Sequence, residues 1–263
     1  MDVLSQLLWI TGAAIGLMFV LWLIHLPLKD AGLVDVGWSF ALGAAAVFCA
    51  LTGEGDETRR WIVGVLGGVW GFRLAYHLLT DRVIGAEHED GRYLMMREKL
   101  GEKAWIVFLG FFEIQALLVG ILALPFALAA SAVEPVGALD VLAIVIWVTG
   151  IVGEAIADWQ LRHFKKDPES KGRVCKRGLW RYSRHPNYFF EWLMWVAYAT
   201  IALPAEWGWL AISAPALMLL LVLKVSGIPP TEARAARSRG AEYRAYQRTT
   251  SAFVPWPPKE EAK

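Results

Sequence analysis

The chain has 263 residues and a formal net charge of +1, and 56% of its residues are apolar, including 14 Trp. Its mean hydropathy is +0.42, and several uncharged runs reach about 20 residues, enough to cross roughly 30 Å of hydrocarbon. This composition excludes a soluble globular enzyme and predicts an all-α membrane protein, for which we expect no nucleic-acid partner.

Cysteine and histidine are too sparse and too scattered for a metal site. Cys49 lies in an apolar run and Cys175 in a basic loop, which argues against a disulfide. The five histidines show no HxxxH or HExxH spacing, so we expect no bound metal. The N-terminus, MDVLSQLLWI, lacks a basic residue and is typical of a first membrane span, not of a cleaved signal peptide.

Seven apolar runs bounded by glycine, proline or charge predict a seven-transmembrane-helix bundle, which we take as a single domain over residues 1–263. The predicted spans cover about 4–27, 33–52, 61–80, 105–130, 139–161, 187–203 and 208–227. The third span contains four closely spaced glycines, Gly64, Gly67, Gly68 and Gly71. These predict a close-packing face, because small residues let membrane helices approach one another.

Positive charge falls on one side of the membrane in this arrangement. Of the 26 Lys and Arg, 23 lie in the turn 28–32, the loops 81–104 and 162–186, and the segment from Lys224 onward. The positive-inside rule then places the N-terminus outside and the C-terminus in the cytoplasm. We expect the bacterial inner (cytoplasmic) membrane, a site that faces the cytoplasm, and a lid-like tail over about 228–263.

Polar side chains gather in the predicted inner half of the membrane. Asp35 begins the second span. Glu154 and Asp158 are four residues apart near the cytoplasmic end of the fifth span, and therefore lie on one helix face. Asn187 and Glu191 repeat this spacing at the start of the sixth span. Carboxylates beside two basic loops predict an anionic ligand that approaches from the cytoplasm.

The stretch WRYSRHPNYFFEW carries the most specific pattern. Pro186 suits the first position of a helix, whose N-terminal N–H groups favour a phosphate. Arg181 and Arg184 add charge-assisted hydrogen bonds. Asn187 can donate and accept with an amide, and Glu191 can accept from an amide or from ribose hydroxyls. A phosphate-bearing cofactor with an amide and sugar hydroxyls would satisfy all of these groups.

The segment GLWRYSRHPNYFFEW, with Asp158 upstream and the closing EYRAYQRTTSAFVPW, resembles the membrane-embedded steroid 5α-reductase superfamily. The likeness is closer to its bacterial DUF1295-type relatives. In that superfamily a seven-helix bundle holds NADPH in a cytoplasm-facing cavity. The resemblance implies NADPH as cofactor and a lipophilic enone or steroid-like substrate that enters from the bilayer. It also implies membrane lipid as a partner and no obligate protein partner.

The resemblance assigns the cofactor site residue by residue. The family's Asn followed four residues later by Glu matches Asn187 and Glu191, and its cofactor-binding Asp matches Asp158. The other implied cofactor-binding residues are basic or aromatic: Arg162, Lys165, Arg173, Tyr182, Arg184, His185, Lys224, Tyr243 and Tyr246.

The catalytic pair departs from the family pattern. Animal steroid reductases carry a Glu early in the second span, where the nearest acid here is Asp35. Their third-span Tyr falls at Trp70, with Tyr76 and His77 as substitutes nearby. The last span ends in KVSGIPPTEAR instead of a basic, histidine-rich sequence. We expect Asp35 and Tyr76 to polarise the substrate ketone.

Two functions stay open. A reductase would use NADPH to deliver hydride to the β-carbon of an α,β-unsaturated ketone. The alternative is a membrane S-adenosylmethionine-dependent methyltransferase of the isoprenylcysteine or phospholipid type, which carries a similar RHPxY segment. Asp158, the Asn187/Glu191 pair and the abundant cytoplasmic base favour the reductase, because three phosphates need more positive charge than a zwitterionic sulfonium.

Overall fold

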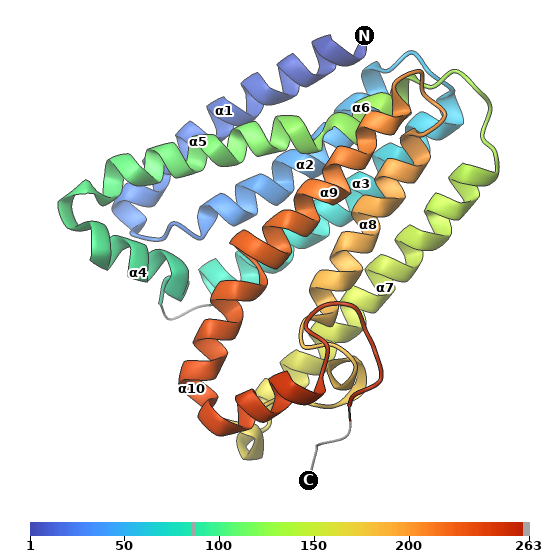
Figure 1. Ribbon diagram of the computed structural model, residues 1–263. Coiled ribbons are helices and arrows are strands. Elements are labelled where there is room, and N and C mark those ends of the chain that lie inside the picture. Colours follow the sequence, from blue (N-terminus) through green and yellow to red (C-terminus); the bar gives the residue numbers. More distant parts are fainter. Residues whose placement is uncertain (86–87, 260–263) are drawn as a thin grey trace. The chain divides into compact units, whose positions relative to one another are not determined.

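The computed structural model describes residues 1–85 and 88–259, and these residues form helices and connecting turns (Figure 1). Within them there is no strand beyond an isolated bridge between Ser183 and Ser251, so the predicted all-α class is confirmed. Two residues of the predicted loop 81–104 and the last four of the predicted tail lie outside the described residues.

The chain divides into two compact units. The first comprises Met1–Gly137 and Ile201–Ala211, and the second comprises Ala138–Thr200 and Ile212–Lys263. The assignment of one domain to residues 1–263 stays a prediction.

The first unit is a bundle of apolar helices. In chain order they are α1 (Val3–Leu28), α2 (Leu33–Thr52), α3 (Glu57–Leu78), α4 (Gly91–Leu100), α5 (Ala104–Leu122) and α6 (Leu124–Ser131). A π-helical turn, Leu79–Ile84, continues α3. α1 packs against α5 and α2, while α2 packs mainly against α3.

Glycines let α2 and α3 pack closely. A Cβ added at Gly71 would lie 2.6 Å from the Cα of Gly43, and one added at Gly67 would lie 2.4 Å from the Cβ of Ala46. Carbon atoms that are not bonded do not approach this closely, so a larger residue at either position would push the helices apart. The predicted close-packing face of α3 is therefore confirmed.

A buried arginine fixes the end of this bundle where α3 begins. Arg59 is 1% exposed, and its guanidinium donates to the carbonyl oxygens of Glu134 at 2.6 Å and Pro135 at 3.1 Å. Asp56 caps α3 by accepting the backbone N–H of Arg59 at 2.9 Å. The guanidinium is thus used to join α3 to the segment that follows α6.

The second unit contains α7 (Ala138–Lys166), α8 (Pro186–Ala202, apart from its last two residues), α9 (Ser213–Leu220) and α10 (Ile228–Thr249). Short 3₁₀ turns at Pro168–Ser170 and Gly178–Arg181 shape the loop between α7 and α8. A π-helical stretch, Leu221–Val225, continues α9. α10 bends at Gly240, whose φ of 53° is a conformation that glycine adopts readily.

Six helical segments of the described residues are long and apolar enough to cross a membrane: Val3–Leu28, Leu33–Thr52, Glu57–Asp81, Gly91–Ser131, Ala138–Lys166 and Gly208–Thr249. They indicate an integral membrane protein. The predicted span at 187–203 corresponds to α8, which has 17 residues. At 1.5 Å per residue α8 is about 26 Å long, short of the roughly 30 Å of hydrocarbon. The seven-span count and the orientation of the termini stay predictions.

Candidate functional site

Two glycines bring α8 against α7. A Cβ added at Gly150 would lie 2.9 Å from the carbonyl oxygen of Phe190, and one added at Gly153 would lie 2.3 Å from a ring carbon of the same residue. Toward the other end of this helix pair, Trp147 Nε1 donates to the hydroxyl of Tyr198 at 2.8 Å. These contacts fix the register in which the polar residues of the two helices meet.

The predicted cofactor residues Asp158 and Asn187 are in contact. Asn187 Nδ2 donates to Asp158 Oδ1 at 3.1 Å. Asp158 lies near the end of α7 and Asn187 is the second residue of α8, and both side chains are partly exposed. One turn further along α8, Glu191 Oε1 accepts from Trp195 Nε1 at 3.1 Å, which orients that carboxylate. Two of the three central predicted residues therefore form one polar pair, and the third lies on the next turn.

The loop between α7 and α8 folds back onto the end of α7. Trp180 Nε1 donates to the carbonyl oxygen of Ala157 at 2.9 Å, and the backbone N–H of Leu179 donates to Gln160 Oε1 at 2.9 Å. Gly178 has a φ of 57°, and a Cβ there would lie 2.2 Å from the Gln160 amide. The loop is thus held against α7 by contacts on both sides of Asp158, at Ala157 and at Gln160.

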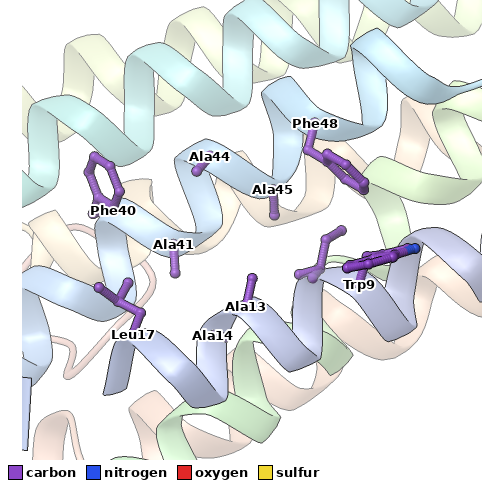
Figure 2. Close-up of a pocket in the computed structure, with 10 residues that line it drawn as sticks. Trp9, Ala13, Ala14, Leu17, Phe40, Ala41, Ala44, Ala45 and Phe48 are labelled. Atoms are coloured by element: carbon purple, nitrogen blue, oxygen red, sulfur yellow. The ribbon is translucent and has the colours of Figure 1, made fainter. Parts of the chain in front are cut away.

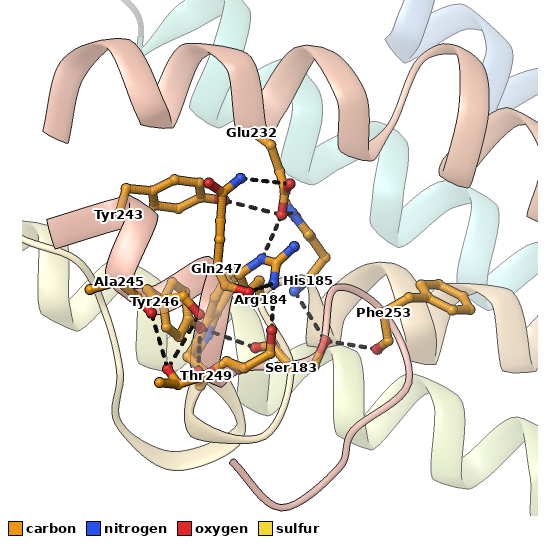
Figure 3. Close-up of polar contacts among 12 residues, drawn as sticks. Ser183, Arg184, His185, Glu232, Tyr243, Ala245, Tyr246, Gln247, Thr249 and Phe253 are labelled. Atoms are coloured by element: carbon orange, nitrogen blue, oxygen red, sulfur yellow. Dashed lines mark hydrogen bonds and ion pairs between the residues drawn. The ribbon is translucent and has the colours of Figure 1, made fainter. Parts of the chain in front are cut away.

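The segment after α10 is bound to the same loop (Figure 3). Ser183 Oγ donates to the carbonyl oxygen of Phe253 at 2.7 Å, and the backbone N–H of Arg184 donates to the carbonyl oxygen of Ser251 at 2.8 Å. Tyr246 of α10 donates from its hydroxyl to the carbonyl oxygen of Ser183 at 3.2 Å. The part of the predicted lid that follows α10 is therefore anchored to the loop in this structure.

Arg184 and His185 are directed at Glu232 of α10 (Figure 3). Arg184 Nε donates to Glu232 Oε1 at 2.6 Å, and His185 Nε2 lies 3.4 Å from the same oxygen. Gln247 Nε2 donates to Glu232 Oε2 at 3.0 Å, and the hydroxyl of Tyr243 approaches Oε1 at 3.5 Å. Four side chains thus converge on one carboxylate, and we name these five residues the Glu232 network.

Glu232 is ionised within this network. It lies on α10, which carries seven charged residues and therefore lies outside the apolar part of the last candidate span. Burial by itself would raise the pKa of Glu232, but the contacts from His185 and Arg184 outweigh burial and lower that pKa to about 2. Arg184 therefore forms a charged pair inside the protein, with its side chain 9% exposed.

The other predicted cofactor residues are exposed or support the loop. The exposed ones are Arg162 and Lys165 on the last turns of α7, Arg173 and Tyr182 in the loop, and Lys224 before α10. Tyr246 is 3% exposed and holds the loop. All of the predicted cofactor residues belong to the second unit. They comprise the Asp158–Asn187 pair with Glu191 one turn further along α8, three members of the Glu232 network, Tyr246, which holds the loop, and the five exposed residues.

We expect Arg184→Met to loosen the segment that follows α10. The substitution leaves Glu232 without its closest counter-charge and removes the donor to the carbonyl oxygens of Gln247 and Thr250. Breaking a buried ion pair on one side typically costs about 3–5 kcal/mol. Limited proteolysis of the purified protein should cut this segment several-fold faster. Arg181→Met, an exposed arginine of the same loop, is the matched control, and equal cleavage of the two variants would contradict a holding role for Arg184.

In the first unit, Asp35 forms a hydrogen bond with the phenol of Tyr93. The Tyr93 hydroxyl donates to Asp35 Oδ1 at 2.8 Å, and Arg92 Nη2 donates to Asp35 Oδ2 at 2.8 Å. Tyr93 is 2% exposed, and its ring meets the edge of Phe108 at 6.3 Å between centroids. Tyr76, the phenol expected from the sequence, is 70% exposed.

Sequence reasoning misses Tyr93 because the stretch 81–104 reads as a cytoplasmic loop. The structure forms α4 there, and its N-cap Asp90 accepts the backbone N–H of Arg92 at 2.9 Å. The pattern DGRYLMMREKL contains the usable signal, an N-capping Asp followed by good helix formers. This helix start predicts a helix that contains Tyr93.

Comparison with known proteins adds a family but no described activity. A family model described as "Protein of unknown function (DUF1295)" matches residues 21–250, which include both polar pairs. The chain is 28% identical over 204 residues to "Uncharacterized protein C594.04c" of Schizosaccharomyces pombe. The alignment covers 68% of this chain and 59% of that relative, so the chain matches less than two thirds of the relative's length. No solved structure matches the chain.

Proposed function

The chain belongs to the family described as Protein of unknown function (DUF1295), and we propose that it is a membrane reductase of the steroid 5α-reductase type. Its proposed reaction is the NADPH-dependent reduction of the C=C bond of a lipophilic, steroid-like α,β-unsaturated ketone. The proposal includes a bundle of seven spans with α8 among them, an external N-terminus and a cytoplasmic C-terminus. It places the protein in the bacterial inner membrane with the site toward the cytoplasm.

The contact between Asp158 and Asn187 carries the proposal. A carboxamide needs both a donor and an acceptor, which the amide of Asn187 supplies, and ribose hydroxyls need acceptors, which carboxylates supply. Such carboxylates are supplied by Asp158 on α7 and by Glu191, which lies one turn after Asn187 on α8. The N-terminus of α8 beside Asn187 favours an anionic group. Amide, sugar and phosphate recognition therefore fit on one short stretch of the second unit.

The basic residues divide into two roles in this proposal. Arg162, Lys165 and Arg173 are exposed and supply positive charge for the phosphates of NADPH. Because Arg184 and His185 contact Glu232, we assign these two residues to holding the loop in place. The donor set of the second unit therefore fits NADPH, with fewer direct phosphate ligands than the sequence predicts.

The acid component of the reaction is assigned to the first unit. Bound NADPH would supply a hydride to the β-carbon of the enone. Asp35 orients the Tyr93 hydroxyl, and Arg92 adds a second fixed donor to the same carboxylate. The phenol carries a single proton, so in this proposal the Tyr93 hydroxyl leaves Asp35 Oδ1 and donates to the ketone oxygen when the substrate binds. The ketone oxygen is then stabilised as enolate charge develops on it, and a proton subsequently reaches the α-carbon. We therefore replace Tyr76 with Tyr93 as the phenol of the proposed pair.

Ligand protection of the purified protein separates this reductase from a membrane methyltransferase. A ligand at 100 times its Kd stabilises the native state by about 2.7 kcal/mol. We expect NADPH to raise the unfolding temperature and S-adenosylmethionine to leave it unchanged. With a panel of enones as substrates, the absorbance of NADPH should then fall as it is oxidised. Protection by S-adenosylmethionine alone would transfer the chain to the methyltransferases, and protection by neither ligand would remove the proposed cofactor site.

A further inference from the structure

An apolar groove lies between α1 and α2 of the first unit (Figure 2). Its volume is about 410 Å³, and none of its ten lining residues is charged. This volume falls within the roughly 300–1,000 Å³ of ordinary small-molecule pockets. The groove is large enough to hold part of a ligand, and its lining specifies a hydrocarbon.

Each helix builds its side of the groove with a large–small–large row of residues at four-residue intervals. The rows are Trp9, Ala13 and Leu17 on α1, and Phe40, Ala44 and Phe48 on α2. Residues four apart lie on one helix face. The large side chains therefore close the two ends of the groove, and the alanines leave its middle open (Figure 2).

The groove does not include Asp35, the α2 residue of the proposed catalytic pair. Ala14, Ala41 and Ala45 also line it, each at most 9% exposed. Asp35 and Ser39 are four residues apart on another stripe of α2, and neither lines the groove. Among its ten lining residues the groove has no charged side chain, and the indole N–H of Trp9 at one end is their only polar side-chain group.

The surface around the groove is apolar and exposed. At the groove itself Trp9 is 68% and Phe40 is 49% exposed, and on another face of α1 Ile15 and Phe19 are 41% and 45% exposed. Both α1 and α2 are candidate membrane spans, so these exposed apolar side chains face hydrocarbon. Apolar cavities exclude water. Lipid tails, which are about as apolar as leucine, are therefore the medium that meets this groove.

We propose that the groove between α1 and α2 binds one hydrocarbon chain of a membrane phospholipid. Each row runs over nine residues, which are eight steps of 1.5 Å or about 12 Å along a helix. This length matches a section of an acyl chain and leaves the headgroup outside. The groove is lined by none of the residues assigned to the proposed reductase chemistry, and its occupancy does not depend on that chemistry.

The test uses the full chain in phosphatidylcholine vesicles with a phosphatidylcholine that bears a diazirine on one acyl chain. After irradiation, mass spectrometry maps the labelled residues. We expect several-fold more labelling at groove residues such as Leu17 and Phe40 than at Phe19. Ala13→Trp should abolish this excess, because Ala13 is exposed at the groove and a large side chain there fills it without entering the packed core. Ile15→Trp, on the lipid-facing surface of the same helix, should leave it unchanged.

Three results would overturn the proposal. The first is equal labelling of the groove and of Phe19, or groove labelling that Ala13→Trp does not reduce. The second is a cross-link from the groove to another copy of the chain, which would assign it to a dimer contact. The third is loss of labelling on addition of a steroid enone, which would assign it to substrate. The labelling needs neither NADPH nor turnover, so it stands or falls separately from the reductase.

Discussion

Replacing Asn187 with Leu should weaken NADPH binding about 10- to 100-fold while the protein still folds. Leucine has no amide, so the substitution removes the hydrogen bond of 3.1 Å that Asn187 Nδ2 donates to Asp158 Oδ1. A carboxylate that loses its donor, together with a cofactor amide that loses its partner, costs about 1–3 kcal/mol. Each 1.4 kcal/mol is about tenfold in affinity. Titration of the purified protein with NADPH measures the change directly.

The neighbouring positions supply the controls for this result. Glu191→Gln keeps an acceptor for Trp195 Nε1 and removes only the charge, so it separates orientation from electrostatics. Thr200→Val changes a residue of the same helix whose hydroxyl bonds only within α8, at Val196, and should have no effect. If both Asn187→Leu and Asp158→Leu bind NADPH as the unaltered chain does, this helix face is not the cofactor site.

The positions of Asp158 and Asn187 near helix ends could be anticipated because helix periodicity and start signals are local, whereas the contact between them joins residues 29 apart and is a property of the fold. The four-residue spacings and Pro186 at the first position of α8 place these groups at helix ends from the sequence alone. The partner of Arg184 could not be anticipated in this way. Glu232 is 48 residues away along the chain, and its approach depends on how α10 turns back after the last span. Long-range pairing of this kind leaves no periodic signal.

The limits of the span prediction have a similar local cause. The run 105–130 reads as one helix by hydropathy, but the structure ends α5 at Leu122 and begins α6 at Leu124, with Pro125 in its first turn. Proline removes one backbone donor and disfavours a continuous helix. Apolar character therefore located helices long enough to cross a membrane, apart from α8, while the break between α5 and α6 depended on a single backbone group.

The groove between α1 and α2 shows what a single helix cannot reveal. Read alone, the run FALGAAAVF predicts only a membrane span with small residues. Small residues serve close packing on the side that faces α3, where Gly43 meets Gly71, and other small residues of the same run leave open space on the side that faces α1. Which of the two outcomes holds depends on the partner helix, and the partner is a property of the fold.

Tyr93→Phe and Asp35→Asn should each lower kcat for enone reduction by about 10²–10⁴-fold, the usual cost of losing a catalytic acid or an oxyanion donor. NADPH affinity should change little, because neither Tyr93 nor Asp35 is among the proposed cofactor residues. Tyr93→Phe removes the hydroxyl that lies 2.8 Å from Asp35 and keeps the ring that packs on Phe108 and Phe111. The protein should therefore fold, and kcat and NADPH affinity should be measured on one preparation.

Tyr76→Phe is the matched control for this prediction, since Tyr76 is 70% exposed on α3 and loses the same single atom. An interaction made only in the transition state lowers kcat without weakening ground-state binding. We therefore expect a drop in kcat for Tyr93→Phe and full activity for Tyr76→Phe. The reverse result would return the catalytic role to Tyr76. A fall in NADPH affinity in both Tyr93→Phe and Asp35→Asn would mean that this pair supports the fold or the cofactor instead of the ketone.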